Sequence, residues 1–356
     1  MSKYVFILLI ITLFLCSLPE SALSLEAGIN ELYYDDGQRY FLYVPASVLQ
    51  NPEGAHILAA IHGYSGRKND SEGIEIVKNN ALRWSSLADE HGWVVLSPQF
   101  DEFRFNDDYQ RLNFSLVGVR ADLRLNELIK KTAKQIPGVN SDKIYLFGFS
   151  GGGQFVHRYA AFYPDRILRA VAAAAGWYLW PDKDLLYPVG LYVSELLYGI
   201  SPDIDGLLSM DLLVLVGEND TGKDDVREDY FIYDLNKIQG ENRKARAENW
   251  VKELEKISVK EGIDFNIELK FAPNTAHTIT GDLKSIAAEY LTVPTEFPPG
   301  DVNKDGVVNI FDVILIGNHL GEEMSATPEP NLDINGDGKV DILDLILVCQ
   351  HFDAGL

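Results

Sequence analysis

The sequence predicts an α/β fold, a mostly parallel β-sheet with helices on both faces, followed by a small helical module. Short β-rich runs alternate with longer helical segments from Arg39 to Phe147 and again further along. That alternation is typical of parallel strands joined by crossover helices. A proline-rich stretch then ends the pattern, and after it a twelve-residue motif occurs twice. We therefore expect one large and one small domain in this chain of 356 residues.

The individual elements follow from local patterns. Strands are expected in the apolar, β-rich runs 40–44, 57–61, 93–96, 143–147, 170–174, 211–216 and 267–271. Apolar positions at helical spacing predict helices over 115–135 and 241–261, and another helix is expected from Asp282. Segment 177–210 is rich in Tyr, Leu and Trp and contains three prolines. It is either an ordinary packed excursion or a lid over a substrate.

The N-terminus is typical of an export signal over residues 1–24. Lys3 is followed by an apolar run from Val5 to Leu15, and Ala22-Leu23-Ser24 fits a small-x-small cleavage site. The run falls short of the roughly 20 residues that span a bilayer, so cleavage is favoured over a membrane anchor. Cys16 would leave with the signal, so a secreted mature chain would keep Cys349 alone and form no internal disulfide.

The charge of the chain disfavours a nucleic-acid partner and favours bound cations. The formal net charge is −22, and no cluster of Lys and Arg offers a site for a nucleic-acid backbone. From Gly300 onward there are eleven Asp and Glu residues against two Lys. Such an acidic tail indicates cation binding. We place the domain boundaries at 25–292 for the large domain, 293–299 for the stiff proline-rich linker and 300–356 for the tail.

The large domain contains a candidate nucleophile. Gly148-Phe149-Ser150-Gly151-Gly152 lies between a predicted strand and a predicted helix, which is the setting of a nucleophile elbow. The sharp turn forces the serine into a strained backbone conformation and holds its hydroxyl at a helix N-terminus. Ser150 is therefore the predicted nucleophile.

A serine hydroxyl needs an imidazole to take its proton and a carboxylate to orient that imidazole. In this kind of fold the acid and then the base follow the serine along the chain. His277 lies in the loop after the last predicted strand, whereas His157 lies on the nucleophile helix and is expected to pack there. Asp220, after the strand 211–216, is the best candidate acid; Glu218, Asp224 and Asp225 compete with it.

Two backbone N–H groups usually meet the oxyanion of the tetrahedral intermediate. We expect one from Gly151, directly after the nucleophile. The other should come from the loop Ile61-His62-Gly63-Tyr64-Ser65-Gly66, and the N–H of Tyr64 is our choice. An ordinary tight turn is the alternative reading of this loop.

With these residues in place, the large domain resembles the α/β-hydrolase superfamily. Within it, the domain is similar to esterases related to polyhydroxybutyrate depolymerases and feruloyl esterases. The resemblance rests on Arg39-Tyr40-Phe41-Leu42-Tyr43-Val44-Pro45, His62-Gly63, Gly148-Phe149-Ser150-Gly151-Gly152-Gly153, Gly217-Glu218-Asn219-Asp220 and His277. It implies the roles given above for Ser150, Asp220, His277, Tyr64 and Gly151.

The repeated motif of the tail has the pattern of a calcium loop. Calcium takes six to eight oxygen ligands, which a twelve-residue loop offers from positions 1, 3, 5, 7, 9 and 12 with Gly at 6. The first copy places Asp301, Asn303, Asp305, the carbonyl of Val307, Asn309 and Asp312 there. The second copy, 32 residues later, places Asp333, Asn335, Asp337, the carbonyl of Lys339, Asp341 and Asp344 there. Two structural calcium ions are therefore expected.

Both loops end in Asp where an ordinary EF-hand ends in Glu, and each runs into an apolar helix. In this the tail resembles a dockerin, a paired-loop module, and the resemblance implies a cohesin-like partner. A module that only stabilises the end of the large domain is the alternative.

Together these features predict a secreted serine hydrolase that cleaves carboxylic esters, from an acylated polysaccharide, a polyester or a small ester, while the tail tethers it to a scaffold or surface. A serine peptidase or an acyltransferase would use the same three side chains. A calcium-dependent binding protein on a degenerate hydrolase fold is the non-enzymatic alternative.

Overall fold

The computed structural model describes residues 25–112, 118–192, 199–223, 233–293, 300, 302, 308–322 and 332–350. The chain divides into two compact units, Met1–Leu291 and Thr292–Leu356. The predicted signal, residues 1–24, lies outside the described residues, as do 294–299 of the predicted linker. Within the described residues, no helix is both long and apolar enough to cross a membrane.

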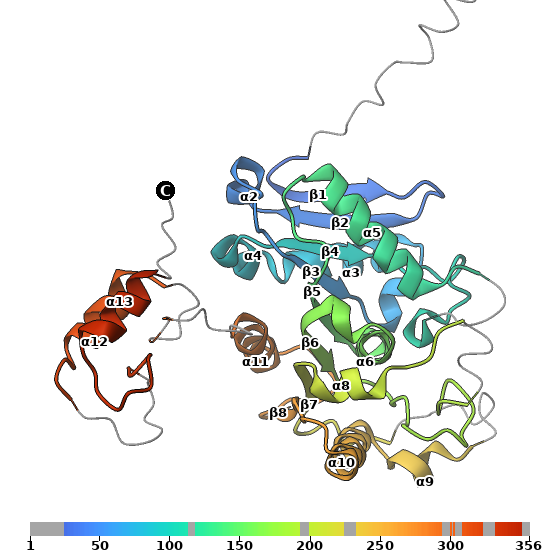
Figure 1. Cartoon of the computed structure of the whole chain (residues 1–356). Helices are drawn as coiled ribbons and strands as arrows, with labels where there is room; N and C mark the ends of the chain where they lie inside the picture. The colour runs from blue at the N-terminus through green and yellow to red at the C-terminus, as the bar shows by residue number, and fades with distance from the viewer. Residues whose placement is uncertain are drawn as a thin grey trace, which may run out of the picture. The chain divides into compact units, whose positions relative to one another are not determined.

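The first unit is built on one eight-stranded sheet, with the order β1-β2-β4-β3-β5-β6-β7-β8 (Figure 1). The strands are β1 (Gly28–Tyr33), β2 (Arg39–Val44), β3 (Ile57–Ile61), β4 (Val94–Pro98), β5 (Ile144–Phe149), β6 (Ile167–Ala173), β7 (Leu212–Gly217) and β8 (Ile267–Ala272). β1 and β2 pair antiparallel, β2 joins β4 antiparallel, and all later pairings are parallel. The predicted mostly parallel sheet is confirmed.

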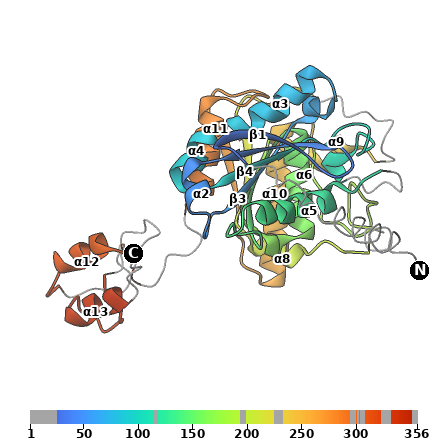
Figure 2. The ribbon, with the colours of Figure 1, turned by 90° about the horizontal axis from the view of Figure 1, so that it is seen from above.

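Helices cover both faces of this sheet, as the view from above shows (Figure 2). One face carries α3 (Ser71–Leu82), α4 (Ser85–His91) and α11 (Gly281–Thr292); the other carries α5 (Ala121–Gln135), α6 (Gly151–Phe162), α8 (Ile204–Ser209) and α10 (Arg243–Glu261). Short helices complete the unit: α2 (Ala46–Gln50), η1 (Tyr64–Arg67), η2 (Tyr109–Arg111), η3 (Pro164–Arg166) and α9 (Leu235–Gln239).

Burial on both faces explains why the central strands are continuous apolar runs. In β3 every residue is buried, and successive side chains enter opposite layers: Ile57, Ala59 and Ile61 join the core under α5 and α6, whereas Leu58 and Ala60 join the core under α3. The strand period of two thus divides a five-residue run between two cores.

Two elements differ from the prediction. β1 was not expected, because most of its residues are only partly buried or exposed at the edge of the sheet, so no apolar run marks it. The helix expected over 115–135 begins at Ala121, after Gly118 takes a left-handed φ of 95° and Arg120 an extended conformation; residues 113–117 lie outside the described residues.

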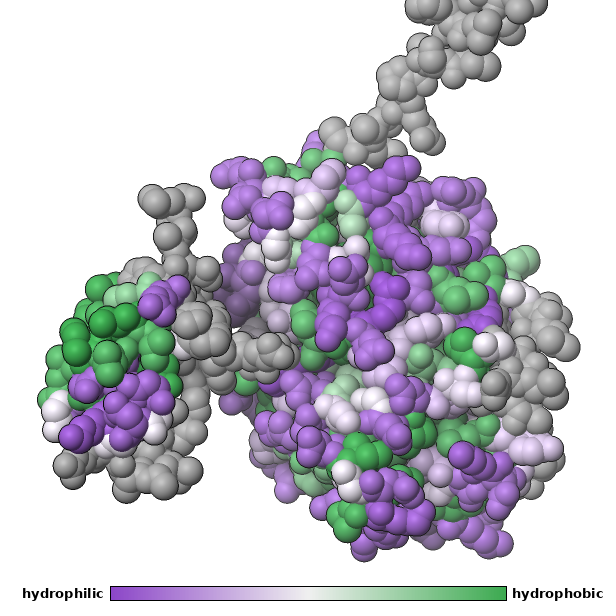
Figure 3. All heavy atoms as spheres, viewed as in Figure 1, coloured by the Kyte–Doolittle hydropathy of each residue, from purple (hydrophilic) through white to green (hydrophobic). Residues whose placement is uncertain are grey.

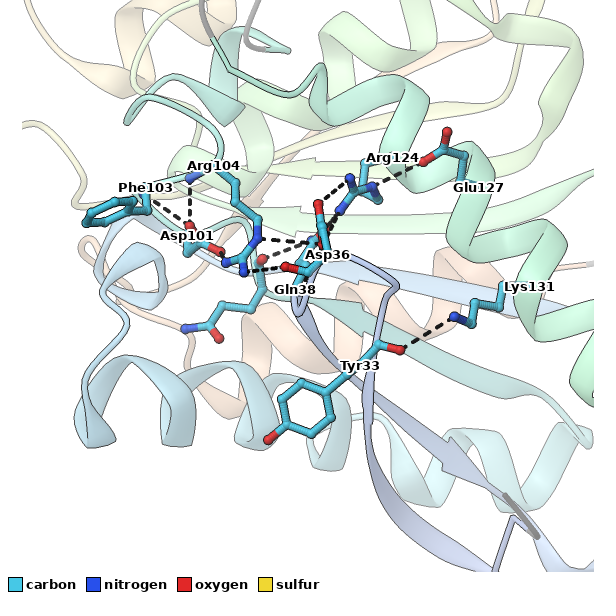
Figure 4. A network of polar contacts seen from close by, with 10 residues as sticks. Tyr33, Asp36, Gln38, Asp101, Phe103, Arg104, Arg124, Glu127 and Lys131 are labelled. Carbon is cyan, nitrogen blue, oxygen red and sulfur yellow. Dashed lines mark hydrogen bonds and ion pairs between the residues drawn. The ribbon is translucent and has the colours of Figure 1, made fainter. Parts of the chain in front are cut away.

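The turn between β1 and β2 is fixed to the rest of the unit by ion pairs (Figure 4). Asp36 receives Arg124 Nη2 of α5 at 2.7 Å and lies 3.6 Å from Arg104 Nε. Arg104 in turn donates to buried Asp101 at 2.7 Å. The network therefore holds the loop after β4, which reaches the candidate site below.

The second unit contains α12 (Ile310–Gly317) and α13 (Ile342–Gln350), one after each repeated loop. Its small core consists of six buried apolar residues, Val302, Val308, Ile316, Leu332, Val340 and Val348. Other apolar side chains of the helices remain exposed, and hydrophobic residues gather on the face of this unit seen in Figure 3; the exposed ones include Ile310, Ile314, Ile342, Leu343 and Ile346.

Candidate active site and calcium loops

Ser150 stands on a sharp turn between β5 and α6. Its backbone has φ 56° and ψ −113°, a left-handed φ that is strained for a residue with a Cβ. The turn is fixed by Ser150 N–H donating to Ala173 O at 2.8 Å, and by Gln154 N–H donating to Ser150 O at 3.0 Å. Strain therefore falls on the residue that the sequence marks as the nucleophile.

The flanking glycines allow α6 to approach the sheet closely. A Cβ on Gly152 would lie 2.3 Å from Ile61 O, and one on Gly148 would lie 2.3 Å from Gly152 O. Both contacts are with backbone atoms, which cannot move aside as a side chain could. Larger residues at these positions would therefore push the helix, and with it the serine, away from the strands.

The side chains of Ser150, His277 and Asp220 form one hydrogen-bonded chain. His277 Nε2 lies 3.0 Å from Ser150 Oγ, and His277 Nδ1 lies 2.8 Å from Asp220 Oδ2. With an N–H on Nδ1 donating to the carboxylate, Nε2 is left as the acceptor for the serine proton. The imidazole also stacks on Phe149, with 5.0 Å between ring centroids.

Parallel strands bring these residues together, because their carboxyl ends meet at one edge of the sheet. Ser150 follows β5, Asp220 follows β7 and His277 follows β8. The acid and base loops also contact each other: Asn219 N–H donates to Thr275 O at 2.8 Å, and a Cβ on Gly217 would lie 2.3 Å from the same oxygen.

Asp220 is 3% exposed, and its second oxygen has a partner that the sequence did not reveal. Arg243 Nη1, at the start of α10, lies 3.3 Å from Asp220 Oδ1. Of the competing acids, Glu218 accepts the N–H of Asn274 at 3.2 Å, and Asp224 and Asp225 lie outside the described residues.

The two predicted oxyanion donors are neighbours. Gly151 begins α6, where first-turn N–H groups have no acceptor within the helix. A Cβ on Gly151 would lie 3.2 Å from the Tyr64 nitrogen, so the two backbone segments are adjacent. The Tyr64 side chain is held by Asp107, which accepts its hydroxyl at 2.6 Å, and by Arg67, whose guanidinium lies 4.2 Å from the ring centre.

His62 supports this loop from beneath. Its Nε2 accepts the N–H of Phe100 at 3.0 Å, which leaves Nδ1–H to donate to Gly63 O at 2.7 Å. Burial lowers the pKa of His62 to about 4, so the ring stays neutral and keeps both bonds at neutral pH. Tyr109 OH adds a bond to His62 O at 2.9 Å.

His157, the other histidine weighed from the sequence, is fully buried on α6. Its ring bonds Gly153 O at 3.0 Å and accepts the N–H of Leu179 at 2.9 Å, and burial lowers its pKa well below the usual value. It packs beneath the segment 177–210 and has no contact with Ser150 in the described structure.

A cavity opens over the serine and histidine. It is lined by residues of the loop after β3, of α3 and its C-terminal end, of the nucleophile turn and of the base loop: His62, Gly63, Tyr64, Ser65, Ile76, Asn80, Arg83, Phe149, Ser150, His277, Thr278 and Ile279. None of the described residues of segment 177–210 is among them. The contribution of α3 was missed from the sequence, because polar and apolar residues alternate there without a sharp helical stripe.

In the second unit, the two repeated loops share one pattern of hydrogen bonds. Asp312 accepts the N–H of Val302 at 3.0 Å and that of Asn309 at 2.8 Å. Asp344, at the equivalent position, accepts the N–H of Ile334 at 2.7 Å and that of Asp341 at 2.8 Å. Both aspartates are fully buried, so the last position of each loop closes back on the second and ninth.

The second loop fits a hard cation by its chemistry. Asp333 accepts N–H groups of Asp337 and Gly338 at 3.1 and 2.8 Å, which turns its oxygens into the loop, and Gly338 has the positive φ, 91°, of a tight turn. Within the described residues, no group of three or more His, Cys, Asp or Glu side chains already stands in a metal-holding arrangement. Of the first loop, Asp301, Asn303, Asp305 and Val307 lie outside the described residues.

Comparisons with solved structures establish the class of the first unit. Poly(aspartic acid) hydrolase-1 from Sphingomonas sp. KT-1 matches with a TM-score of 0.60 and 26% identity, over 74% of this chain and 98% of that one. The poly(3-hydroxybutyrate) depolymerase LpqC from Bordetella parapertussis matches with a TM-score of 0.58 and 22% identity, over 76% and 92%. The first unit therefore has the α/β-hydrolase fold.

Residues 299–353 match the family model described as "Dockerin type I domain". The chain therefore carries a dockerin type I domain at its C-terminus, after a domain with the α/β-hydrolase fold. Dockerin type I domains bind calcium, and dockerins bind cohesins.

Relatives by sequence match over shorter stretches. A probable acetylxylan esterase A from Aspergillus clavatus is 26% identical over 143 residues, 39% of this chain and 43% of that protein. The human lysosomal Pro-X carboxypeptidase is 28% identical over 139 residues, 37% of this chain and 27% of that protein. The chain thus spans less than half the length of either relative.

Proposed function

We propose that the hydrolase domain is a serine esterase that works through an acyl-enzyme. The observation that carries the proposal is the hydrogen-bonded chain from Ser150 Oγ through His277 to Asp220, with distances of 3.0 and 2.8 Å. The strained backbone of Ser150 and the cavity above it support the same reading.

In this mechanism His277 Nε2 takes the proton of Ser150 as Oγ attacks the ester carbonyl. Asp220 holds the Nδ1–H tautomer and stabilises the imidazolium that forms. The N–H groups of Tyr64 and Gly151 receive the oxyanion. His277 then gives its proton to the leaving alcohol, and a water molecule, activated in the same way, attacks the acyl-serine and releases the acid.

The role of the dockerin domain is tethering. We infer that Asp301, Asn303, Asp305, the Val307 carbonyl, Asn309 and Asp312 hold one calcium ion, and that Asp333, Asn335, Asp337, the Lys339 carbonyl, Asp341 and Asp344 hold a second. Calcium would fix the two loops relative to α12 and α13. The exposed apolar residues of these helices would then meet a cohesin-like partner on an extracellular scaffold, where an acylated polysaccharide or a polyester is the expected substrate.

Replacing Ser150 by Ala tests the mechanism. We expect hydrolysis of a short-chain p-nitrophenyl ester to fall by about 10⁶-fold, as for loss of a serine that acts with its histidine as one unit. A fluorophosphonate probe should label the wild-type chain and fail to label the variant. Substantial turnover by the variant would contradict the proposal.

The same three side chains could serve a peptidase or an acyltransferase, and the partial similarity to a carboxypeptidase makes the amide comparison worthwhile. Matched p-nitrophenyl esters and p-nitroanilides separate the activities. We expect esters to be cleaved much faster; a marked preference for the anilide would replace the esterase assignment.

A further inference from the structure

Arg83 brings a positive charge into the cavity that holds the candidate nucleophile. It follows the last residue of α3 and lines the same cavity as Ser150 and His277. The cavity wall is partly apolar, since Ile76 and Ile279 line the same cavity. No step of the proposed ester hydrolysis uses this guanidinium.

The polar contacts of Arg83 differ from those of the other arginines. Its Nη1 donates to Asn80 Oδ1 at 3.0 Å, and among the described residues no carboxylate pairs with it. The remaining described arginines each contact a carboxylate or donate to a backbone carbonyl: Arg39, Arg67, Arg104, Arg111, Arg120, Arg124, Arg158, Arg166, Arg169, Arg243 and Arg246. In a chain of net charge −22, this cation is left for another partner.

Asn80 fixes the position of the guanidinium. It is 3% exposed, and its amide nitrogen donates to Ala60 O of β3 at 2.8 Å. That bond leaves the amide oxygen directed to Arg83. The guanidinium is therefore positioned from the sheet itself, and its other N–H groups are not buried.

The guanidinium charge of Arg83 is also partly removed from water, which is unfavourable. Arg83 is partly buried, and burial lowers the pKa of its guanidinium, with no carboxylate of the described part of the chain opposing the shift. A partly desolvated cation without a counter-ion gains free energy when an anion enters its site. A carboxylate matches the planar donors of a guanidinium in a bidentate pair.

We propose that Arg83 binds a carboxylate of the substrate, so that the enzyme prefers esters whose acyl or alcohol part is acidic. The apolar residues Ile76 and Ile279 would contact the carbon atoms between that carboxylate and the ester group. The inference rests on the proposed esterase function and narrows its substrate class.

Two pairs of esters test this preference and locate the carboxylate. In the acyl pair, mono-p-nitrophenyl adipate is compared with p-nitrophenyl hexanoate. In the alcohol pair, 4-acetoxybenzoate is compared with 4-methylphenyl acetate. For each pair, kcat/KM of the acidic ester is divided by that of the neutral one. Differences in intrinsic reactivity cancel when this ratio is compared between variant and wild type.

We expect Arg83→Gln to lower the ratio by about 10- to 100-fold in at least one pair, which is the range for hydrogen bonds to a charged group. Arg83→Lys should keep part of the preference, because an ammonium retains the charge and loses the bidentate geometry. Lys78→Gln is the matched control: it removes a positive charge from a half-exposed position of α3 that does not line the cavity, where Lys78 Nζ lies 3.7 Å from Glu75, and it should leave both ratios unchanged.

The inference would be overturned if a folded Arg83→Gln enzyme still hydrolysed neutral esters and showed an unchanged ratio in both pairs. The esterase proposal would then still stand. A wild-type chain that hydrolyses none of the four esters would overturn both. Thermal unfolding of each variant shows that the comparison is made between folded proteins.

Discussion

The hydrolase domain and the dockerin domain differ in what stabilises their folds. The first buries apolar side chains on both faces of an eight-stranded sheet, whereas the second has six buried apolar residues and two acidic loops. A core of that size rarely holds a domain together without a metal or a crosslink. The large core can support a strained serine and a buried aspartate, whereas we expect the small one to need a cation that brings its own acidic groups together.

After the loss of the serine itself, the largest expected effect concerns the polar site that the large core supports. Asp220→Asn should lower kcat/KM for a p-nitrophenyl ester by about 10⁴-fold, because an asparagine no longer selects the productive imidazole tautomer. Steady-state kinetics measure the loss. Glu218→Gln, two residues earlier on the same loop, is the control and should remain within about threefold of wild type; equal losses in the two variants would leave the acid unassigned to Asp220.

Removal of calcium should affect the dockerin domain strongly and the hydrolase domain very little. With a chelator, we expect amide exchange in α13 to accelerate by at least about 100-fold, since ion binding is coupled to folding of such a module. Hydrogen exchange of the full chain, read by mass spectrometry, measures this. Ester turnover should change less than twofold.

Intrinsic fluorescence provides a second readout for the same experiment, because all Trp and Tyr residues precede residue 291. Their emission reports on the hydrolase domain alone. A fluorescence transition on chelation, together with loss of turnover, would show that the two domains are coupled and contradict the division drawn here.

A smaller effect is expected where α6 contacts the sheet. Gly152→Ala places a Cβ 2.3 Å from Ile61 O and 2.9 Å from His62 O, so the helix must shift. We expect a loss of about 3 kcal/mol in the free energy of unfolding, the upper range for overpacking. Denaturant titration followed by Trp fluorescence measures it. Gly281→Ala, where a Cβ meets open space, should stay within about 0.5 kcal/mol of wild type.

The smallest effect is a dependence of stability on pH. Burial lowers the folded-state pKa of His62 to about 4, below the unfolded value of 6.5, so the unfolded chain binds the extra proton between these values. The stabilisation is complete above pH 6.5 and declines as pH falls toward 4. From pH 7 to pH 5 the loss from this group amounts to roughly 2 kcal/mol.

Substituting His62 by Asn should reduce that acid-dependent loss, measured by denaturant titration at the two pH values. The buried His157, whose pKa is also lowered, contributes with the same sign and remains in the variant. An identical pH dependence in wild type and variant would falsify the role assigned to His62.

The sequence predicted what depends on local pattern and missed what depends on packing. The central strands were predicted because a strand buried on both faces consists of consecutive apolar residues, as in β3 and β7. The edge strand β1 is mostly half-buried or exposed and has no such run. The fold class and the dockerin domain were predicted correctly. The catalytic roles of Ser150, His277 and Asp220 stay predictions, although the structure brings the three side chains into hydrogen-bonding distance.

Arg243 and Arg83 show why the rest could not be predicted. Neither lies in a recognisable motif. Each comes to the site because of where its helix packs: α10 contacts β7 and β8 near the acid loop, and α3 contacts η1 in the loop after β3. Such contacts depend on how the helices lie on the sheet, which residue spacing along the chain does not specify.

Ser150 and His277 lie 127 residues apart along the chain, and this separation affects when activity can first arise during folding. In the proposed mechanism the serine is synthesised long before its base, and the base loop follows β8, the strand that pairs with β7 at the edge of the sheet. Until β8 pairs with β7, Ser150 would lack the proton acceptor that this mechanism requires. The first appearance of ester turnover during refolding would therefore mark the moment when the sheet is complete.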